Sequence, residues 1–258
     1  MDLELAAKVV LITGGTDGLG LALATRLAQE GGAVAICGRD ADRLAAAHAS
    51  VQAAGGEVLA VRADMERAED IREFVEAAEA RWGRIDGVVH NAGRSAGGAL
   101  ESIDDATWEG DLQLKLMGAV RLTRMALPRL RESRGSVLFT LATSAKAPGA
   151  SSAPSSVSRA AGMALMKSLS KELGPDGVRV NAILIGLIQS GQWVRRAAAA
   201  GVPLPAFYEQ MAEGAGIPLG RVGRSEEFAD LASFLLSARA SYLSGTAINL
   251  DGGLSPAV

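Results

Sequence analysis

The chain has 258 residues, a formal net charge of −3 and hydrophobic residues at 48% of its positions. That length suits one large α/β domain or two small ones, and the apolar share excludes a largely disordered chain. The weak acidic excess argues against nucleic acid or an anionic membrane surface as a partner.

The sequence also predicts the compartment. Cys37 is the only cysteine, so no disulfide forms within one chain, which is typical of a reducing environment. Residues 1–7 lack the basic and apolar parts of a signal peptide, and no apolar run approaches the roughly 20 residues of a membrane span. We therefore expect a soluble, cytoplasmic protein without nucleic-acid or membrane partners.

The first half of the chain alternates short apolar runs with helical spacing. The apolar runs predict strands at 8–13, 33–37, 57–62 and 86–90, and the helical spacing predicts helices over 21–30, 40–54 and 66–82. Asp40 is a suitable cap for the second of these helices.

The second half continues this pattern with one interruption. We predict helices over 104–131, 155–173 and 225–237, with Ser225 as the cap of the last, and strands at 136–141, 178–185 and 246–250. Residues 186–222 carry Pro203, Pro205 and Pro218, which indicates an irregular excursion. Long irregular segments near a site are often lids, so this one is a candidate substrate lid.

Repeated strand–helix–strand units indicate a parallel sheet covered by helices on both faces. No linker interrupts the pattern, so we predict a single α/β domain over residues 1–258.

The turn after the first strand is rich in glycine: Gly14, Gly15, Gly18 and Gly20. Glycine permits unusual backbone angles and lets the backbone approach a pyrophosphate at the N-terminus of the following helix. Because a strand precedes the turn and a helix follows it, we predict a dinucleotide site here.

Residues 13–20 resemble the Thr-Gly-x-x-x-Gly-x-Gly signature of the short-chain dehydrogenase/reductase family. The likeness continues through Asp64, Asn91-Ala92-Gly93, Val180-Asn181-Ala182, Gly186-Leu187-Ile188-Gln189-Ser190, Arg221-Val222-Gly223 and Asp251-Gly252-Gly253. It covers nearly the whole chain. The resemblance implies a single Rossmann-type domain with a doubly wound, parallel, seven-stranded sheet. It also implies a homotetramer built partly through the two long helices.

The resemblance implies a nicotinamide cofactor. The residues expected to hold it are Gly14, Thr16, Asp17, Gly18, Leu19, Gly20, Arg39, Asp64, Met65, Asn91, Ala92, Gly93, Arg159, Gly186 and Ile188. At the end of the second strand, where an acidic residue would bind the ribose of NAD, the chain has Gly38 and then Arg39. A guanidinium suits a 2′-phosphate, so we favour NADP, with NAD as the alternative.

The family's catalytic pattern is changed in this chain. Ser155 stands at the position of the catalytic tyrosine, Arg159 at that of the lysine, Ala142 at that of the serine and Lys115 at that of the asparagine. Thr143 and Ser144 follow Ala142 and are candidates to replace the missing serine. The site is therefore expected to be atypical.

A serine hydroxyl is shorter and far less acidic than a phenol, and Arg159 does not release a proton at neutral pH. Lys115 is a candidate general acid, because the like charge of Arg159 is expected to lower its pKa. The competing interpretation is a structural Lys115 paired with a carboxylate. Tyr208, in the predicted lid, is an alternative source of the proton. Lys115 and Arg159 together would also suit an anionic substrate.

We expect an NAD(P)-dependent oxidoreductase that acts on a small-molecule carbonyl, imine or activated alkene. The alternatives are a nucleotide-binding sensor or assembly subunit without catalysis, and non-redox chemistry on the same fold. No cluster of residues has metal-ligand spacing, so no metal is expected.

Overall fold

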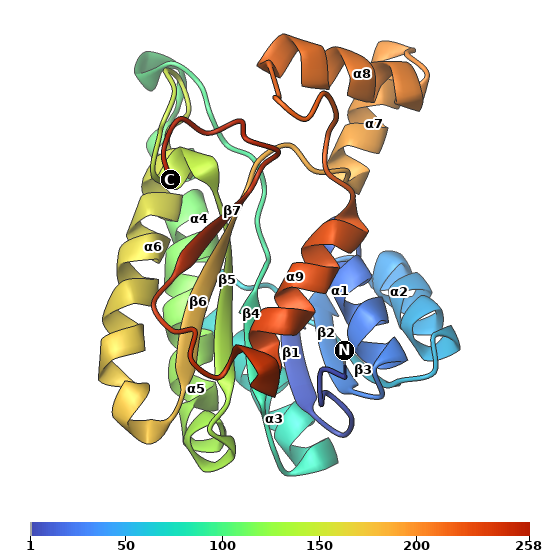
Figure 1. The fold of residues 1–258 in the computed structure, drawn as a ribbon, viewed down its shortest axis with the longest axis vertical. Coiled ribbons are helices and arrows are strands. Elements are labelled where there is room, and N and C mark those ends of the chain that lie inside the picture. The colour runs from blue at the N-terminus through green and yellow to red at the C-terminus, as the bar shows by residue number, and fades with distance from the viewer. Residues whose placement is uncertain (1) are drawn as a thin grey trace.

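The structure, a computed structural model, describes residues 2–258 and contains one parallel sheet in the order β3-β2-β1-β4-β5-β6-β7 (Figure 1). The strands are β1 (Val9–Thr13), β2 (Ala33–Gly38), β3 (Glu57–Arg62), β4 (Gly87–His90), β5 (Ser136–Ala142), β6 (Arg179–Ile185) and β7 (Ala247–Leu250). The chain starts in the middle of the sheet, builds one edge and crosses back to build the other. This order confirms the predicted doubly wound, seven-stranded sheet.

Helices cover both faces of the sheet. They are α1 (Gly18–Gln29), α2 (Ala41–Ala53), α3 (Ala68–Trp82), α4 (Asp105–Leu112), α5 (Gly118–Ser133), α6 (Ser155–Glu172), α7 (Gly191–Ala200), α8 (Leu204–Ala215) and α9 (Ser225–Leu236). One core cluster joins the sheet to α3, α5 and α6, and the other joins it to α1, α2 and α9. The inner strands are apolar and buried on both faces, as expected of a covered parallel sheet.

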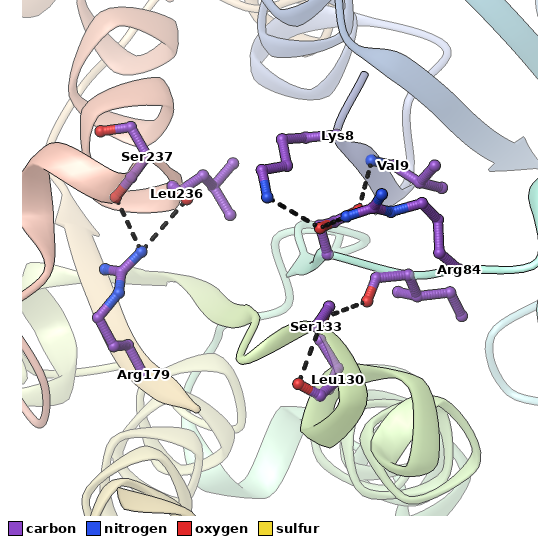
Figure 2. A network of polar contacts seen from close by, with 10 residues as sticks. Lys8, Val9, Arg84, Leu130, Ser133, Arg179, Leu236 and Ser237 are labelled. Atoms are coloured by element: carbon purple, nitrogen blue, oxygen red, sulfur yellow. Dashed lines mark hydrogen bonds and ion pairs between the residues drawn. The ribbon is translucent and has the colours of Figure 1, made fainter. Parts of the chain in front are cut away.

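Polar side chains tie the amino ends of the central strands to neighbouring segments (Figure 2). The carboxylate of Asp86 accepts hydrogen bonds from Val9 N at 3.0 Å, from Lys8 Nζ at 3.2 Å and from Arg84 at 2.7 and 2.8 Å. Arg179 donates to main-chain carbonyls at the end of α9, including those of Leu236 and Ser237. These contacts fix the edge of the sheet opposite the nucleotide turn.

The predicted irregular excursion is wrong in its secondary structure: residues 186–222 contain α7 and α8, which stand beyond the carboxyl edge of the sheet (Figure 1). Pro203 caps α8 and Pro205 lies in its first turn, where a missing N–H breaks no helical hydrogen bond. Gly201 and Gly216, both with positive φ, end the two helices. The prolines thus mark a helix start rather than a loop.

Two other predicted boundaries also change. The helix predicted over 104–131 is broken, because residues 113–117 form a π-helical turn between α4 and α5. α9 begins at Ser225, so the residue that precedes it is Arg224 and the cap is not Ser225. Glu227, in the first turn of α9, accepts the main-chain N–H of Arg224 at 2.7 Å.

Candidate active site

The glycine turn between β1 and α1 packs tightly against the next turn of the same edge. Gly14 has φ +66°, a value that favours glycine. A Cβ on Gly20 would overlap the carbonyl oxygen of Gly14 and come within 2.5 Å of the Asn91 side-chain nitrogen. The turn therefore needs glycine at these positions for space as well as for backbone angles.

Asn91 and Thr13 hold the ends of β1 and β4 together. The Asn91 side chain donates to the carbonyls of Thr13 and Gly14, both at 3.0 Å. Thr13 Oγ1 accepts the main-chain N–H groups of Asn91 and Ala92 and donates to the carbonyl of Val89. Asn91 thus shapes the glycine turn, so the side chain predicted to contact the cofactor is occupied in supporting the turn.

The first turn of α1 is suited to an anion. Asp17 precedes the helix but makes no capping hydrogen bond with its side chain, and the N–H groups of Gly18 and Leu19 have no acceptor among residues 2–258. Ser190 lies against this turn: its Cβ would be 3.0 Å from a Cβ on Gly18, and its buried Oγ has no hydrogen-bond partner among residues 2–258. Free amides and an orphaned hydroxyl fit a bound phosphate or carboxamide.

Asp17 itself links the turn to the predicted lid. Its carboxylate accepts a hydrogen bond from Arg195 Nη1 of α7 at 3.0 Å and lies 4.0 Å from Arg43. It fills the space beside Gly191, where a Cβ would collide with it. The negative charge of Asp17 would repel a phosphate at this turn, and the positive charges of Arg195 and Arg43 balance it.

At the end of β2, Gly38 leaves no room for a side chain, because a Cβ would lie 2.5 Å from Thr16 Cγ2. Arg39 follows, exposed, with its guanidinium 3.7 Å from Asp64 and 3.8 Å from Glu66. Asp64 and Glu66 thus hold the Arg39 guanidinium beside the adenosine end of the predicted cofactor site. Met65, between them in the sequence, is buried in the core.

A second cluster of functional groups lies where the π-helical turn meets α6. Lys115, 4% exposed in its side chain, donates a hydrogen bond to the buried carboxylate of Asp111 and another to Ser155 Oγ at 2.6 Å. The other oxygen of Asp111 accepts Ser158 Oγ at 2.6 Å. π-helical turns inside helices are frequent at functional sites, and this one carries Lys115 into the site.

The Ser155 hydroxyl has a defined direction. Its oxygen accepts two hydrogen bonds, from Lys115 Nζ at 2.6 Å and from the main-chain N–H of Ala96 at 2.9 Å. A hydroxyl oxygen has two lone pairs, so both are occupied and the O–H is left to donate to a third group.

Arg159 lies one helical turn beyond Ser155. Nη1 donates to the carbonyl of Thr140 on β5, and Nη2 would be 3.2 Å from a Cβ on Gly93. The guanidinium therefore spans from the sheet to the Asn91-Ala92-Gly93 turn. Lys115 and Arg159 line the same small cavity, as predicted for the two cations.

The pKa of Lys115 is lowered from 10.5 to about 8. Burial is the largest cause; the hydrogen bond to Asp111 raises the pKa, and the positive charges of Arg159 and Arg94 lower it. The predicted direction is correct, but its predicted main cause, the charge of Arg159, is smaller than the effect of burial. At neutral pH the ammonium form dominates, with the free amine close in energy.

The other candidates lie away from this cluster. Thr143 and Ser144 form a short turn after β5, and neither lines the cavity that holds Lys115. Tyr208 lines a separate cavity under α8 with residues such as Leu204 and Val222. The two cavities share no lining residue, so this conformation does not bring Tyr208 to Lys115.

Asp111 and Ser158 were missed by the sequence interpretation. Both had a signal: Asp111 precedes Lys115 by four residues and Ser158 follows Ser155 by three, which places each pair on one helix face. The structural interpretation of Lys115, pairing with a carboxylate, is thus correct in its contact, and Asp111 is the partner.

Comparison with known proteins places this geometry in a family. A family model described as enoyl-(acyl carrier protein) reductase matches residues 14–255. L-fucose dehydrogenase from Oryctolagus cuniculus is 36% identical over 253 residues, which cover 96% of this chain and 85% of that protein.

Solved structures agree. A short-chain oxidoreductase from Pseudomonas aeruginosa PAO1, described as containing an atypical catalytic center, is 35% identical in its apo form, with a TM-score of 0.93 and 100% of both chains covered. The chain belongs to the short-chain dehydrogenase/reductase family. The NADPH-bound structure of the same Pseudomonas protein has a TM-score of 0.92 and covers 97% of this chain and 98% of that one.

In this short-chain dehydrogenase/reductase, Lys115 contacts Ser155 directly and lines the same cavity as Arg159. Within residues 2–258, no group of three or more His, Cys, Asp or Glu side chains is placed to hold a metal ion. No helix in that range is long and apolar enough to cross a membrane.

Proposed function

We propose that the protein is an NADPH-dependent oxidoreductase that reduces a carbonyl compound, with Lys115 as the source of the proton. The observation that carries this proposal is the hydrogen bond from Lys115 Nζ to Ser155 Oγ at 2.6 Å, at the position where the family pattern has a phenol. The structural relatives support the cofactor: the short-chain oxidoreductase from Pseudomonas aeruginosa has an NADPH-bound structure.

The residues of the glycine turn fit NADPH. The free amides of Gly18 and Leu19 at the start of α1 and the unpartnered hydroxyl of Ser190 would receive the pyrophosphate and the nicotinamide end. Arg39 would bind the 2′-phosphate, and Arg159 the nicotinamide ribose. Bound NADPH supplies a hydride for the carbonyl carbon.

The proton is delivered in two linked transfers. The Ser155 O–H, which has no acceptor among residues 2–258, donates its proton to the carbonyl oxygen as that oxygen gains negative charge. Lys115 gives an N–H proton to Ser155 Oγ in the same step and becomes a neutral amine. Ser155 thus provides the position of the donor and Lys115 its acidity.

The remaining expectations are part of the same proposal. Helices α7 and α8 act as the substrate lid, with the ion pair between Arg195 and Asp17 as its contact with the glycine turn. Lys115 and Arg159 favour a substrate that carries a negative charge near the carbonyl. A homotetramer, expected from the family resemblance, and a cytoplasmic location, expected from the single cysteine, complete the proposal.

The experiment starts with cofactor binding, measured by NADPH fluorescence. NADPH consumption is then followed with a panel of carbonyl compounds that includes 2-keto acids, 3-ketoacyl thioesters and ketoses. Lys115→Met is expected to lower kcat by about 100-fold or more, since a positioned general acid contributes roughly 10²–10⁴-fold, while the Kd for NADPH changes little.

Tyr208→Phe is the matched control, because it removes the alternative phenol from the lid cavity, and it is expected to keep kcat within about twofold, like other changes outside the reacting groups. No NADPH binding at millimolar concentration contradicts the cofactor assignment. Undiminished turnover by Lys115→Met contradicts the assignment of the proton donor. Tight binding without turnover of any carbonyl favours a nucleotide sensor.

A further inference from the structure

Lys115 makes a second side-chain contact, with Asp111, that the proposed reaction does not use. Behind the ammonium lies the carboxylate of Asp111, 1% exposed, at the end of α4. One of its oxygens accepts Lys115 and the other accepts Ser158 Oγ at 2.6 Å. The family pattern implied roles for the tyrosine, lysine, serine and asparagine positions only, so these two residues are additional to it.

We propose that Asp111 is a positioning residue for the reaction: it holds the ammonium of Lys115 against Ser155 and sets the pH range in which that ammonium is charged, while Ser158 holds the carboxylate in place. This proposal rests on the role of Lys115 in the proposed function. It adds to the proposed function a buried carboxylate, Asp111, and a second serine, Ser158, which position the proton donor.

Geometry supports the positioning role. Lys115 has four side-chain carbons, so its ammonium can occupy many places unless it is held. Asp111 and Ser155 receive it from two different helices, and Ser158 keeps the Asp111 carboxylate from turning. The hydrogen bonds therefore leave one ammonium position, within reach of the hydroxyl that faces the substrate.

The charges around Lys115 support the role of Asp111 in keeping the ammonium charged. Arg159 on α6 and Arg94 after β4 are both cationic and disfavour the ammonium, although Arg94 is paired with a carboxylate outside the site. His90 on β4 is buried and neutral, because burial lowers its pKa to about 3. Asp111 is the carboxylate that hydrogen-bonds Lys115 within residues 2–258. Without it, burial and two cations would all favour the neutral amine.

The decisive readout is the titration of Lys115 itself, followed by NMR of the enzyme labelled with ¹³C at lysine Cε. The chain has five lysines, and the Lys115 signal is assigned by its loss in Lys115→Met. In Asp111→Asn, the midpoint of the Lys115 titration is expected to fall by at least about one pH unit relative to the unmodified enzyme, because the neighbouring negative charge of Asp111 is gone.

Ser158→Ala gives a second, opposite test. It removes one donor from the carboxylate, whose charge then acts more strongly on the ammonium, so the Lys115 midpoint is expected to rise. Asp111→Glu restores the negative charge and is expected to bring the midpoint back toward that of the unmodified enzyme. NADPH binding, unchanged in each variant, verifies that the nucleotide half is folded.

Kinetics separate positioning from general damage. Asp111→Asn is expected to lower kcat about fivefold or more near pH 8, as the protonated fraction of Lys115 falls, but to recover within a few-fold of the unmodified enzyme near pH 6, where Lys115 is again protonated. A midpoint that is the same in all variants overturns the proposal, as does an equal loss of kcat at every pH. If Lys115→Met is fully active, the proposed function fails. If the Lys115 midpoint nevertheless shifts in Asp111→Asn, the electrostatic effect of Asp111 on Lys115 stands.

Discussion

At the scale of single residues, the proposed reaction divides between two side chains the position and the acidity that a phenol would combine in one. Ser155 has a hydroxyl in a fixed direction but a pKa too high to release a proton by itself. Lys115 has a pKa of about 8 and touches that hydroxyl. Because the ammonium is the form that donates, we expect carbonyl reduction to fall as the pH rises through about 8.

Substitution of Arg39 tests, also at the residue scale, whether the protein prefers NADPH over NADH. Arg39→Ala removes the exposed guanidinium that is proposed to bind the 2′-phosphate. The Kd for NADPH is expected to rise about tenfold or more, since a charge-assisted hydrogen bond is worth roughly 1.5–3 kcal/mol, while that for NADH changes little. Fluorescence titration with the two cofactors gives the comparison. Equal effects on both would mean that Arg39 does not distinguish them.

The sequence predicted some of these residues and missed others for physical reasons. Lys115, Ser155 and Arg159 were candidates because the family resemblance predicts a different catalytic residue at each of these positions of the pattern. Asp111 and Ser158 replace nothing in that pattern, and only the packing of α4 against α6 shows that they meet. The orphaned hydroxyl of Ser190 likewise depends on its burial.

At the scale of elements, the glycine turn and the π-helical turn position the two halves of the site. The strand–turn–helix of β1 and α1 was predictable, because glycine spacing marks it directly. The π-helical turn was not, since residues 107–117 contain no proline and their one glycine, Gly110, lies inside α4 and not in the turn itself. α7 and α8 were missed because Pro203, directly before α8, and Pro205, inside it, led us to interpret the whole segment as irregular.

Gly20→Ala tests the packing of the glycine turn. The added Cβ would overlap the Gly14 carbonyl and the Asn91 side chain, so the turn must move away from its present position. The Kd for NADPH is expected to rise about tenfold or more, because the backbone must approach the pyrophosphate closely. Isothermal titration calorimetry measures this.

Gly214→Ala is the matched control for that substitution. Gly214 lies in α8, and a Cβ there would meet nothing within 4 Å. It is expected to leave NADPH binding unchanged and to stabilise the helix by about 0.5–1 kcal/mol. Similar losses of binding in both variants would contradict the account of the turn.

At the scale of the whole molecule, the alternation of strands and helices was enough to predict a doubly wound sheet. The order β3-β2-β1-β4-β5-β6-β7 follows from right-handed crossovers and one reversal after β3. The sheet brings the carboxyl ends of β1, β4 and β5 to one edge, where both halves of the site lie. The opposite edge carries structural contacts such as the hydrogen bonds to Asp86 from Lys8, Val9 and Arg84, the three donors labelled in Figure 2.

Asp86 is expected to link global stability to pH. Burial raises its pKa, but the hydrogen bonds from Arg84 and Val9 and the charge of Lys8 outweigh burial, so the net pKa is lowered. Its contribution is therefore present above about pH 4, the ordinary pKa of an aspartate, and is lost as the pH falls through the lower folded value.

Asp86→Asn is expected to lower the free energy of unfolding by about 2–4 kcal/mol near pH 7, because it removes a buried partner of two cations. Urea unfolding between pH 7 and pH 3 should show this difference narrowing below about pH 4. A difference that stays constant over that range would mean that the charge of Asp86 contributes nothing.

The central claim is that hydride transfer takes place in a site without the tyrosine. The most direct measurement uses NADPH carrying deuterium at C4 in each of its two stereochemical forms, with mass spectrometry of the alcohol produced from the best carbonyl of the panel. The account predicts a product heavier by one mass unit with one form of the cofactor and not with the other. NADPH that binds tightly but transfers deuterium to no carbonyl would contradict it.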